Sequence, residues 1–208
     1  MSLWGRVFAV GYERVIAASE RAGLAERRAV LLAGARGRVL EIGPGPAMNL
    51  RHYPPSVEEV VLAEPEEAMA RRLEKKMAEE GLAGTVVRAP AEDLPFEDDS
   101  FDTAVSTFVL CTVDDPARTL AELARVLRPG GELLVMEHVR AEEGSRVARW
   151  QDRLERPWHF LAHGCHPNRR TAQLIEDSPL ALEELEPDRM PKAAPLVTPM
   201  IIGRARAR

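Results

Sequence analysis

The chain has 208 residues, a length that fits one domain of ordinary size. Hydrophobic residues make up 45% and charged residues 29%, which supplies a buried core and excludes a wholly disordered chain. The 28 basic and 33 acidic side chains give a net charge of −5, so no basic excess marks a nucleic-acid groove. Two cysteines, Cys111 and Cys165, do not make a secreted disulfide framework, and the cytoplasm is the expected location.

The N-terminal residues 1–37 are rich in Ala, Leu, Glu and Arg and predict helix. The first apolar stretch is interrupted by Arg6 and followed by Glu13 and Arg14, so it is too short and too charged to span a bilayer. We expect a helical cap on the domain, with a helix lying on a membrane surface as the alternative.

Strand and helix patterns alternate through the middle of the chain. Apolar runs predict strands at 38–42, 59–64, 85–89, 102–106 and 132–137, with helices at 66–80 and from 116 to about 127. Asp115 can cap the second helix, and Pro116 suits its first position because an N–H is not needed there. Pro129-Gly130-Gly131 is expected to stop this helix before the fifth strand. The alternation predicts a parallel sheet with helices on both faces.

The alternation of strand and helix patterns ends after about residue 141. Residues 144–170 contain three aromatic residues and three histidines, and they predict an inserted, mostly helical segment. Two late strands, near 180–186 and 196–205, are expected to close the sheet. The expected organisation is one domain, 1–208, made of a cap (1–37), a core (38–140), a helical insert (141–179) and two last strands (180–208).

A glycine-rich turn, Glu41-Ile42-Gly43-Pro44-Gly45, follows the first strand. Ligands of such sheets bind beyond the carboxyl ends of the strands, and glycine lets the backbone approach a ligand closely. A dinucleotide fingerprint would need glycine where Met48 stands, and no P-loop sequence follows. Glu64, at the end of the second strand, can accept hydrogen bonds from both ribose hydroxyls of a nucleoside. A ribose and an amino-acid tail without phosphates describe S-adenosylmethionine, whose ammonium group Glu41 can attract.

These motifs resemble those of class I S-adenosylmethionine-dependent methyltransferases with a type 11 domain, over about residues 12–140. The matching segments are 39–45, 62–65, 91–96, 100–102 and 125–131. The resemblance implies an α/β, Rossmann-like, seven-stranded and mostly parallel sheet with helices on both faces. It also implies methyl transfer from S-adenosylmethionine to a small molecule, with S-adenosylhomocysteine as the product.

The resemblance also implies a set of cofactor-binding residues. Gly43 and Gly45 are expected under the methionine moiety, and Glu64 at the ribose. The full expected set is Tyr12, Glu41, Gly43, Gly45, Asn49, Glu64, Pro65, Met69, Ala91, Glu92, Thr107 and Phe108. The family's usual Thr-Gly pair after the second glycine is Pro46-Ala47 here, and Pro46 removes one N–H from the loop.

The downstream half resembles thiol S-methyltransferases and their bacterial relatives more closely. The matching segments downstream are 137–139, 150–151, 157–159 and 164–169, and Asn49, 53–55 and 109–111 match as well. Animal members carry a hydrophobic N-terminal anchor that we do not find here, and Ser178-Pro179 replaces a Gly-Phe pair, so the substrate-side wall is expected to differ. The expected substrate-side residues are Trp150, Trp158, His159, Cys165, His166 and Arg169.

His138, at the end of the fifth strand, is the candidate general base, with a structural histidine as the alternative. The residues His159, His163, Cys165 and His166 are dense enough to suggest zinc, but two ordered pairs of ligand spacings are missing, so no metal is expected. Cys165 is expected to pack and not to act as a nucleophile, because methyl transfer needs no covalent intermediate.

The leading hypothesis is methyl transfer to an apolar thiol. Positioning can supply most of the acceleration, and a thiol of pKa about 8.5 is partly ionised near neutral pH. The alternatives are a hydroxyl or amine acceptor in a quinol, phenol or lipid headgroup, with His138 or His166 as base, and a cofactor-binding protein without turnover. We expect a small-molecule acceptor, no nucleic acid, no stable membrane insertion, and a monomer or homodimer.

Overall fold

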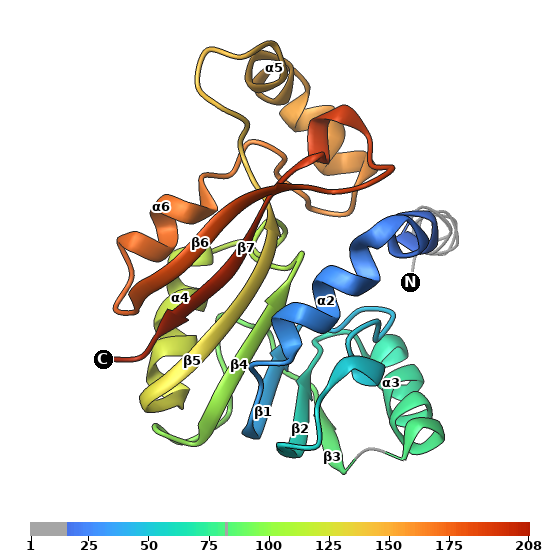
Figure 1. Cartoon of the computed structure of the whole chain (residues 1–208), viewed down its shortest axis with the longest axis vertical. Helices are drawn as coiled ribbons and strands as arrows, with labels where there is room; N and C mark the ends of the chain where they lie inside the picture. Colours follow the sequence, from blue (N-terminus) through green and yellow to red (C-terminus); the bar gives the residue numbers. More distant parts are fainter. Residues whose placement is uncertain (1–15, 82) are drawn as a thin grey trace.

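The computed structural model describes residues 16–81 and 83–208, and its centre is a seven-stranded sheet in the order β3-β2-β1-β4-β5-β7-β6 (Figure 1). The strands are β1 (Gly37–Ile42), β2 (Val57–Ala63), β3 (Gly84–Val87), β4 (Phe101–Thr107), β5 (Leu127–His138), β6 (Ala181–Arg189) and β7 (Pro199–Arg206). Strands β1 to β5 pair in parallel, and β7 runs antiparallel between β5 and β6. The expected seven-stranded, mostly parallel sheet is confirmed.

Helices cover both faces of this sheet, as the strand–helix alternation predicts. The helices are η1 (Glu20–Leu24), α2 (Ala25–Leu32), η2 (Leu50–His52), α3 (Glu67–Glu80), α4 (Pro116–Val126), α5 (Arg146–Leu161), α6 (Thr171–Glu176) and η3 (Pro195–Val197). Helices α2 and α3 pack on one face, and α4 and α6 pack on the other. A helix able to span a bilayer does not occur within residues 16–81 or 83–208.

Successive residues of the central strands alternate between the two layers. On β5, Leu134 and Met136 join the cluster of α2, whereas Leu133 and Val135 join the cluster of α4. All four side chains are at most 2% exposed. Burial on both faces explains why these strands read as nearly continuous apolar runs.

The fifth strand begins earlier than the expected residue 132, although the helix before it ends within one residue of its expected end. Helix α4 ends at Val126, and β5 begins directly at Leu127, so Pro129-Gly130-Gly131 lies inside the strand. Gly130 donates its N–H to the carbonyl of Ala207, and Ala207 donates to Gly131, so the C-terminal residues extend the pairing of β5. A register shift against β4 absorbs the irregular backbone.

Helices α5 and α6 lie within the region expected to be a helical insert. Figure 1 shows α5 beyond the carboxyl end of β5, beside the red segment that carries η3, and α5 contacts η3. The four-part division of the domain stays a prediction. The described N-terminal residues are helical from residue 16, with a non-helical Gly23 at φ 114°. Tyr12 and the candidate membrane-surface helix of the first residues lie outside the described residues.

The start of α4 allows a direct test of the local sequence reading. The Asp115 side chain accepts a hydrogen bond from the Arg118 N–H at 3.0 Å, as expected of an N-cap. We predict that Asp115→Ala lowers the free energy of unfolding by about 1 kcal/mol, because the N–H loses its partner. Asp115→Asn keeps an acceptor and is the matched control in urea denaturation. Equal losses in the two variants would contradict the capping role.

Candidate functional site

Two hollows lie at the carboxyl ends of the central strands, where strand order reverses between β1 and β4. The larger, about 470 Å³, is lined by Gly43, Ala63, Glu64, Pro65, Glu66, Pro90, Ala91, Glu92, Val109, Thr112, Val113, Asp114 and His163. The smaller, about 150 Å³, is lined by Ile16, Arg28, Gly43, Pro44, Gly45, Pro46, Met48, Asn49, Thr107 and Phe108. Gly43 belongs to both walls, so the two hollows meet at the glycine-rich turn. This is the position at which sheets of this type bind ligands.

Gly43 and Gly45 are needed in this turn for different reasons. Both have a φ of 51°, which favours glycine. A Cβ on Gly43 would lie 2.8 Å from Cγ2 of Val109, whereas a Cβ on Gly45 would meet nothing closer than 3.9 Å. Gly43 therefore permits a close approach of the loop after β4, and Gly45 permits the backbone turn itself. Ala47, at which the resemblance implies glycine, adopts the left-handed conformation with a φ of 57°.

Glu64 lines the larger hollow directly after β2. It is 8% exposed, and burial raises the pKa of its carboxyl group, against the lowering effect of the hydrogen bond from the Glu66 N–H. That N–H, 3.0 Å from Oε1, is the one hydrogen-bond donor to Glu64 in the described part of the chain. The carboxylate therefore keeps acceptor capacity for hydroxyl groups of a ligand in the hollow.

Of the four expected cofactor-binding residues between 65 and 92, three line the larger hollow and one does not. Pro65, Ala91 and Glu92 line the larger hollow. Glu92 Oε1 accepts the N–H groups of Asp114 at 3.0 Å and Asp115 at 3.5 Å, so it also fixes the chain before α4. Met69 packs half-buried on α3 beside the Leu73 cluster and is not part of the wall.

An ion-pair network forms one wall of the smaller hollow. Arg28, on α2 and only 3% exposed, donates from Nε to Glu20 at 2.7 Å. Its Nη1 donates to Asn49 Oδ1 at 2.7 Å and to Thr107 Oγ1 at 3.2 Å. The guanidinium also lies 5.6 Å from the ring centre of Phe108. The Arg28 guanidinium, paired with Glu20, is thus held at the wall by contacts that include the distant Asn49 and Thr107.

Glu41 is buried behind this wall and does not line either hollow. Its two carboxylate oxygens accept hydrogen bonds from Asn49 Nδ2 at 2.9 Å and from the Tyr53 hydroxyl at 2.6 Å. Burial raises the pKa of Glu41, and the two hydrogen bonds act in the opposite direction. Burial beside Glu41 also raises the pKa of Tyr53 well above its usual value. The geometry therefore makes Glu41 a support for Asn49.

A second buried carboxylate, Glu137, organises the loop after β4. Its Oε1 accepts from Ser106 Oγ at 2.7 Å and from the N–H groups of Val109 and Leu110, both at 3.0 Å, and Oε2 accepts the N–H of Cys111 at 3.3 Å. Burial raises the pKa of Glu137 against these hydrogen bonds. One side chain at the end of β5 thus sets the path of the loop that reaches both hollows.

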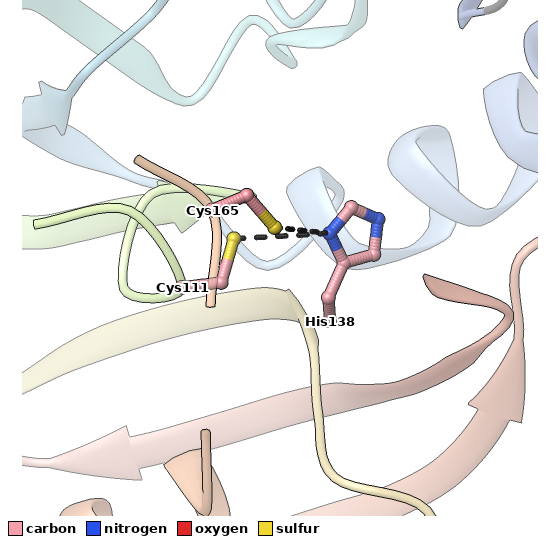
Figure 2. A group of neighbouring side chains, drawn as sticks. All are labelled: Cys111, His138 and Cys165. Atoms are coloured by element: carbon pink, nitrogen blue, oxygen red, sulfur yellow. Dashed lines mark hydrogen bonds between the residues drawn. The ribbon is translucent and has the colours of Figure 1, made fainter. Parts of the chain in front are cut away.

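His138 lies beside two cysteines and is not a lining residue of either hollow (Figure 2). Its Nδ1 is 3.7 Å from Cys111 Sγ and 3.9 Å from Cys165 Sγ, and its Nε2 is 3.2 Å from Met190 Sδ. The hydrogen bond between the thiols, with burial, raises the pKa of Cys111; the same bond lowers the pKa of Cys165. Both nitrogens of the candidate base therefore face sulfur atoms of the chain.

Only some of the expected substrate-side residues lie together. Trp158 packs beside the two cysteines, and the His159 ring lies 4.4 Å from the ring of His166. His166 Nδ1 pairs with Glu155 at 2.7 Å. Arg169 donates to the carbonyls of Leu110 and Val113, both at 2.7 Å, and so holds the loop after β4. The remaining expected residue, Trp150, is 52% exposed on α5.

Sequence reasoning assigned no role to three residues of this region: Arg28, Tyr53 and Glu137. Tyr53 and Glu137 stand in the segments 53–55 and 137–139 that carry the thiol-methyltransferase resemblance, which is the signal that could have found them. Arg28 stands in an arginine-rich helix that shows no motif, and its role depends on the distant Asn49 and Thr107.

The stabilisation that the hydrogen bond from Tyr53 to Glu41 provides is expected to depend on pH. We predict that Tyr53→Phe lowers the free energy of unfolding by about 1–3 kcal/mol, because a buried acceptor loses its donor. Removing the donor raises the pKa of Glu41 further in the folded state. A carboxyl with a raised folded pKa favours folding in acid, and that contribution is lost as the pH rises through the folded pKa. The destabilisation should therefore be larger above neutral pH than in mild acid.

Urea denaturation of wild type and variant at the two pH values measures this difference. Tyr53→Phe in a Glu41→Gln background is the control, and there the dependence on pH should disappear. An equal loss at both pH values in the single variant would contradict the coupling between Tyr53 and Glu41.

Comparisons with known proteins agree with this geometry. The family model described as "Methyltransferase domain" matches residues 40–135. Human thiol S-methyltransferase TMT1B is 37% identical over 179 residues, which cover 84% of this chain and 73% of the relative. Phosphatidylethanolamine N-methyltransferase of Cereibacter sphaeroides is 34% identical over 142 residues, covering 64% and 68%.

A solved S-adenosylmethionine-dependent methyltransferase from Thermotoga maritima superposes with a TM-score of 0.70 at 25% identity, over 100% of both chains. The sheet order, the glycine-rich turn at the reversal point and the acid after β2 agree with this likeness. The chain belongs to the class I S-adenosylmethionine-dependent methyltransferases.

Proposed function

We propose that this enzyme transfers the methyl group of S-adenosylmethionine to a small apolar thiol. The observation that carries the proposal is the pair of hollows that meet at Gly43, with Glu64 in the larger and Arg28 in the smaller. The resemblance to a thiol S-methyltransferase over most of the chain favours a thiol as the acceptor.

The hollows fit the two halves of the cofactor. The larger one suits the adenosine, because the buried Glu64 keeps acceptor capacity for the ribose hydroxyls. The smaller one suits the methionine moiety, because the Arg28 guanidinium offers a cation to its carboxylate. Gly43 leaves the space between them free of a side chain. Glu41 acts by holding Asn49 in this wall.

Positioning and exclusion of water are the main tasks of the chain's residues. When bound, S-adenosylmethionine supplies an activated methyl group on its sulfonium. The Phe108 ring lines the smaller hollow, between the guanidinium of Arg28 and the ring of His138, 4.6 Å away. This apolar ring excludes water from the methionine side. The hydrogen bonds to Glu137 fix the loop carrying Phe108 before any ligand binds.

A thiol acceptor agrees with the surroundings of His138. Both ring nitrogens of His138 face sulfur atoms, so its geometry does not present a base to a hydroxyl acceptor. A thiol is partly ionised near neutral pH and reacts as the thiolate without a strong protein base. The second candidate, an amine acceptor, has the support of the 34% identity with a phosphatidylethanolamine N-methyltransferase.

The ribose role of Glu64 can be tested by cofactor binding alone. We predict that Glu64→Gln weakens S-adenosylmethionine binding at least about tenfold, because hydrogen bonds to a charged acceptor contribute about 1.5–3 kcal/mol each. Isothermal titration gives the affinity, and the rise of Tm with cofactor concentration confirms it. Glu67→Gln changes an exposed acid at the start of α3, three residues along the chain, and should bind normally. Unchanged binding by Glu64→Gln would contradict the assignment of Glu64 to the ribose.

The acceptor can be tested with molecules that differ in one atom. We predict that an arylalkyl thiol yields S-adenosylhomocysteine, whereas the alcohol and amine with the same carbon skeleton do not. Turnover at low thiol concentration should fall about tenfold per pH unit below the thiol's pKa, since the thiolate reacts. Turnover of the amine in place of the thiol would favour the second candidate. A cofactor-dependent rise in Tm without turnover of any acceptor would favour a binding protein.

A further inference from the structure

We propose that Cys111, His138 and Cys165 form a binding site for a zinc ion. The three side chains come from the loop after β4, the end of β5 and the turn after α5, and Figure 2 shows both sulfurs directed at the imidazole. One ligand atom from each lies within 4.8 Å of the other two, and all three residues are buried. This site is separate from the two hollows assigned to the cofactor.

The distances agree with tetrahedral coordination. Zinc binds sulfur at about 2.3 Å and imidazole nitrogen at about 2.0–2.1 Å, so a tetrahedral angle separates nitrogen and sulfur by about 3.5 Å. The Nδ1 atom of His138 lies 3.7 Å from Cys111 Sγ and 3.9 Å from Cys165 Sγ. Shifts of a few tenths of an ångström would bring each sulfur to this separation from Nδ1, and the two sulfurs lie within 4.8 Å of each other. Two thiolates and one imidazole are a donor set that zinc prefers.

The tautomer of His138 suits a metal ligand. The thioether of Met190, 3.2 Å from Nε2, can only accept a hydrogen bond. Nε2 therefore carries the hydrogen, and the lone pair of Nδ1 faces the two sulfurs. Ligand histidines of metal sites usually donate a hydrogen bond from the other ring nitrogen, and Met190 is the acceptor here.

Hydrogen bonds also fix the backbone around both cysteines. The N–H of Cys111 donates to Glu137, and Arg169 donates to the carbonyls of Leu110 and Val113 on either side of it. The N–H of Cys165 donates to the carbonyl of Ala162. The backbone that carries both thiols is thus fixed in the described structure. A bound zinc would join α5 and its following turn to the carboxyl edge of the sheet.

The spacing of these residues along the sequence does not indicate a metal site. The sequence predicts no metal because zinc ligands usually come in pairs a few residues apart. Here His138 stands 27 residues from each cysteine. A second group, Glu155, His159 and His166, lies nearby, but it has no thiolate, and its three residues are partly exposed. It therefore serves as the internal comparison.

Zinc binding to the reduced, metal-free full chain tests the proposal, by competition with a chromophoric chelator. We expect one ion per chain. Cys111→Ser and Cys165→Ser should each weaken zinc binding at least about tenfold. His166→Gln and Glu155→Gln, in the comparison group, should leave it unchanged. Bound zinc should also raise the Tm of wild type and protect both thiols from a thiol reagent.

Cobalt gives a second readout that does not depend on the folding of any variant. Co²⁺ bound to wild type should show a thiolate-to-metal charge-transfer band. Absence of zinc and cobalt binding to the reduced wild type would overturn the proposal. Cobalt binding without the charge-transfer band, or zinc binding that follows His166 and Glu155 in place of the cysteines, would overturn it equally.

Discussion

The structure around the site depends on the burial of one carboxylate, Glu137, at the end of β5. Burial without partners would be costly, and four hydrogen bonds from Ser106 and the loop after β4 offset that cost. The same bonds fix the loop backbone, so Val109 meets Gly43, Phe108 lines the smaller hollow and Cys111 faces His138. The two hollows and the group of Cys111, His138 and Cys165 therefore share one support.

Much of the fold could be predicted from sequence because its determinants are local. Buried strands read as short apolar runs, and the Asp115-Pro116 pair marks the start of α4. The start of β5 was expected too late, at residue 132, because Ala207, from the far end of the chain, completes the pairing at Gly130 and Gly131. The edge strand β6 also extends through Pro187, which an edge position tolerates.

Part of the candidate site could also be predicted, because its residues follow local patterns in the sequence. Gly43, Gly45 and Glu64 stand at strand ends, where the topology alone brings them together. The hydrogen bonds in the wall of the smaller hollow could not be predicted, because Arg28, Asn49 and Thr107 meet only through tertiary packing. The group of Cys111, His138 and Cys165 needs three segments whose proximity no spacing encodes.

The composition of β6 bears on how copies of this enzyme can associate. At the outer edge of the sheet, β6 carries Glu183, Glu184 and Glu186, and Pro187 offers no N–H for pairing. A second β6 laid alongside would bring like charges together and find a gap in its hydrogen-bond ladder. The opposite edge, β3, is only four residues long. Continuous growth of the sheet from one molecule into the next is thus discouraged at both margins.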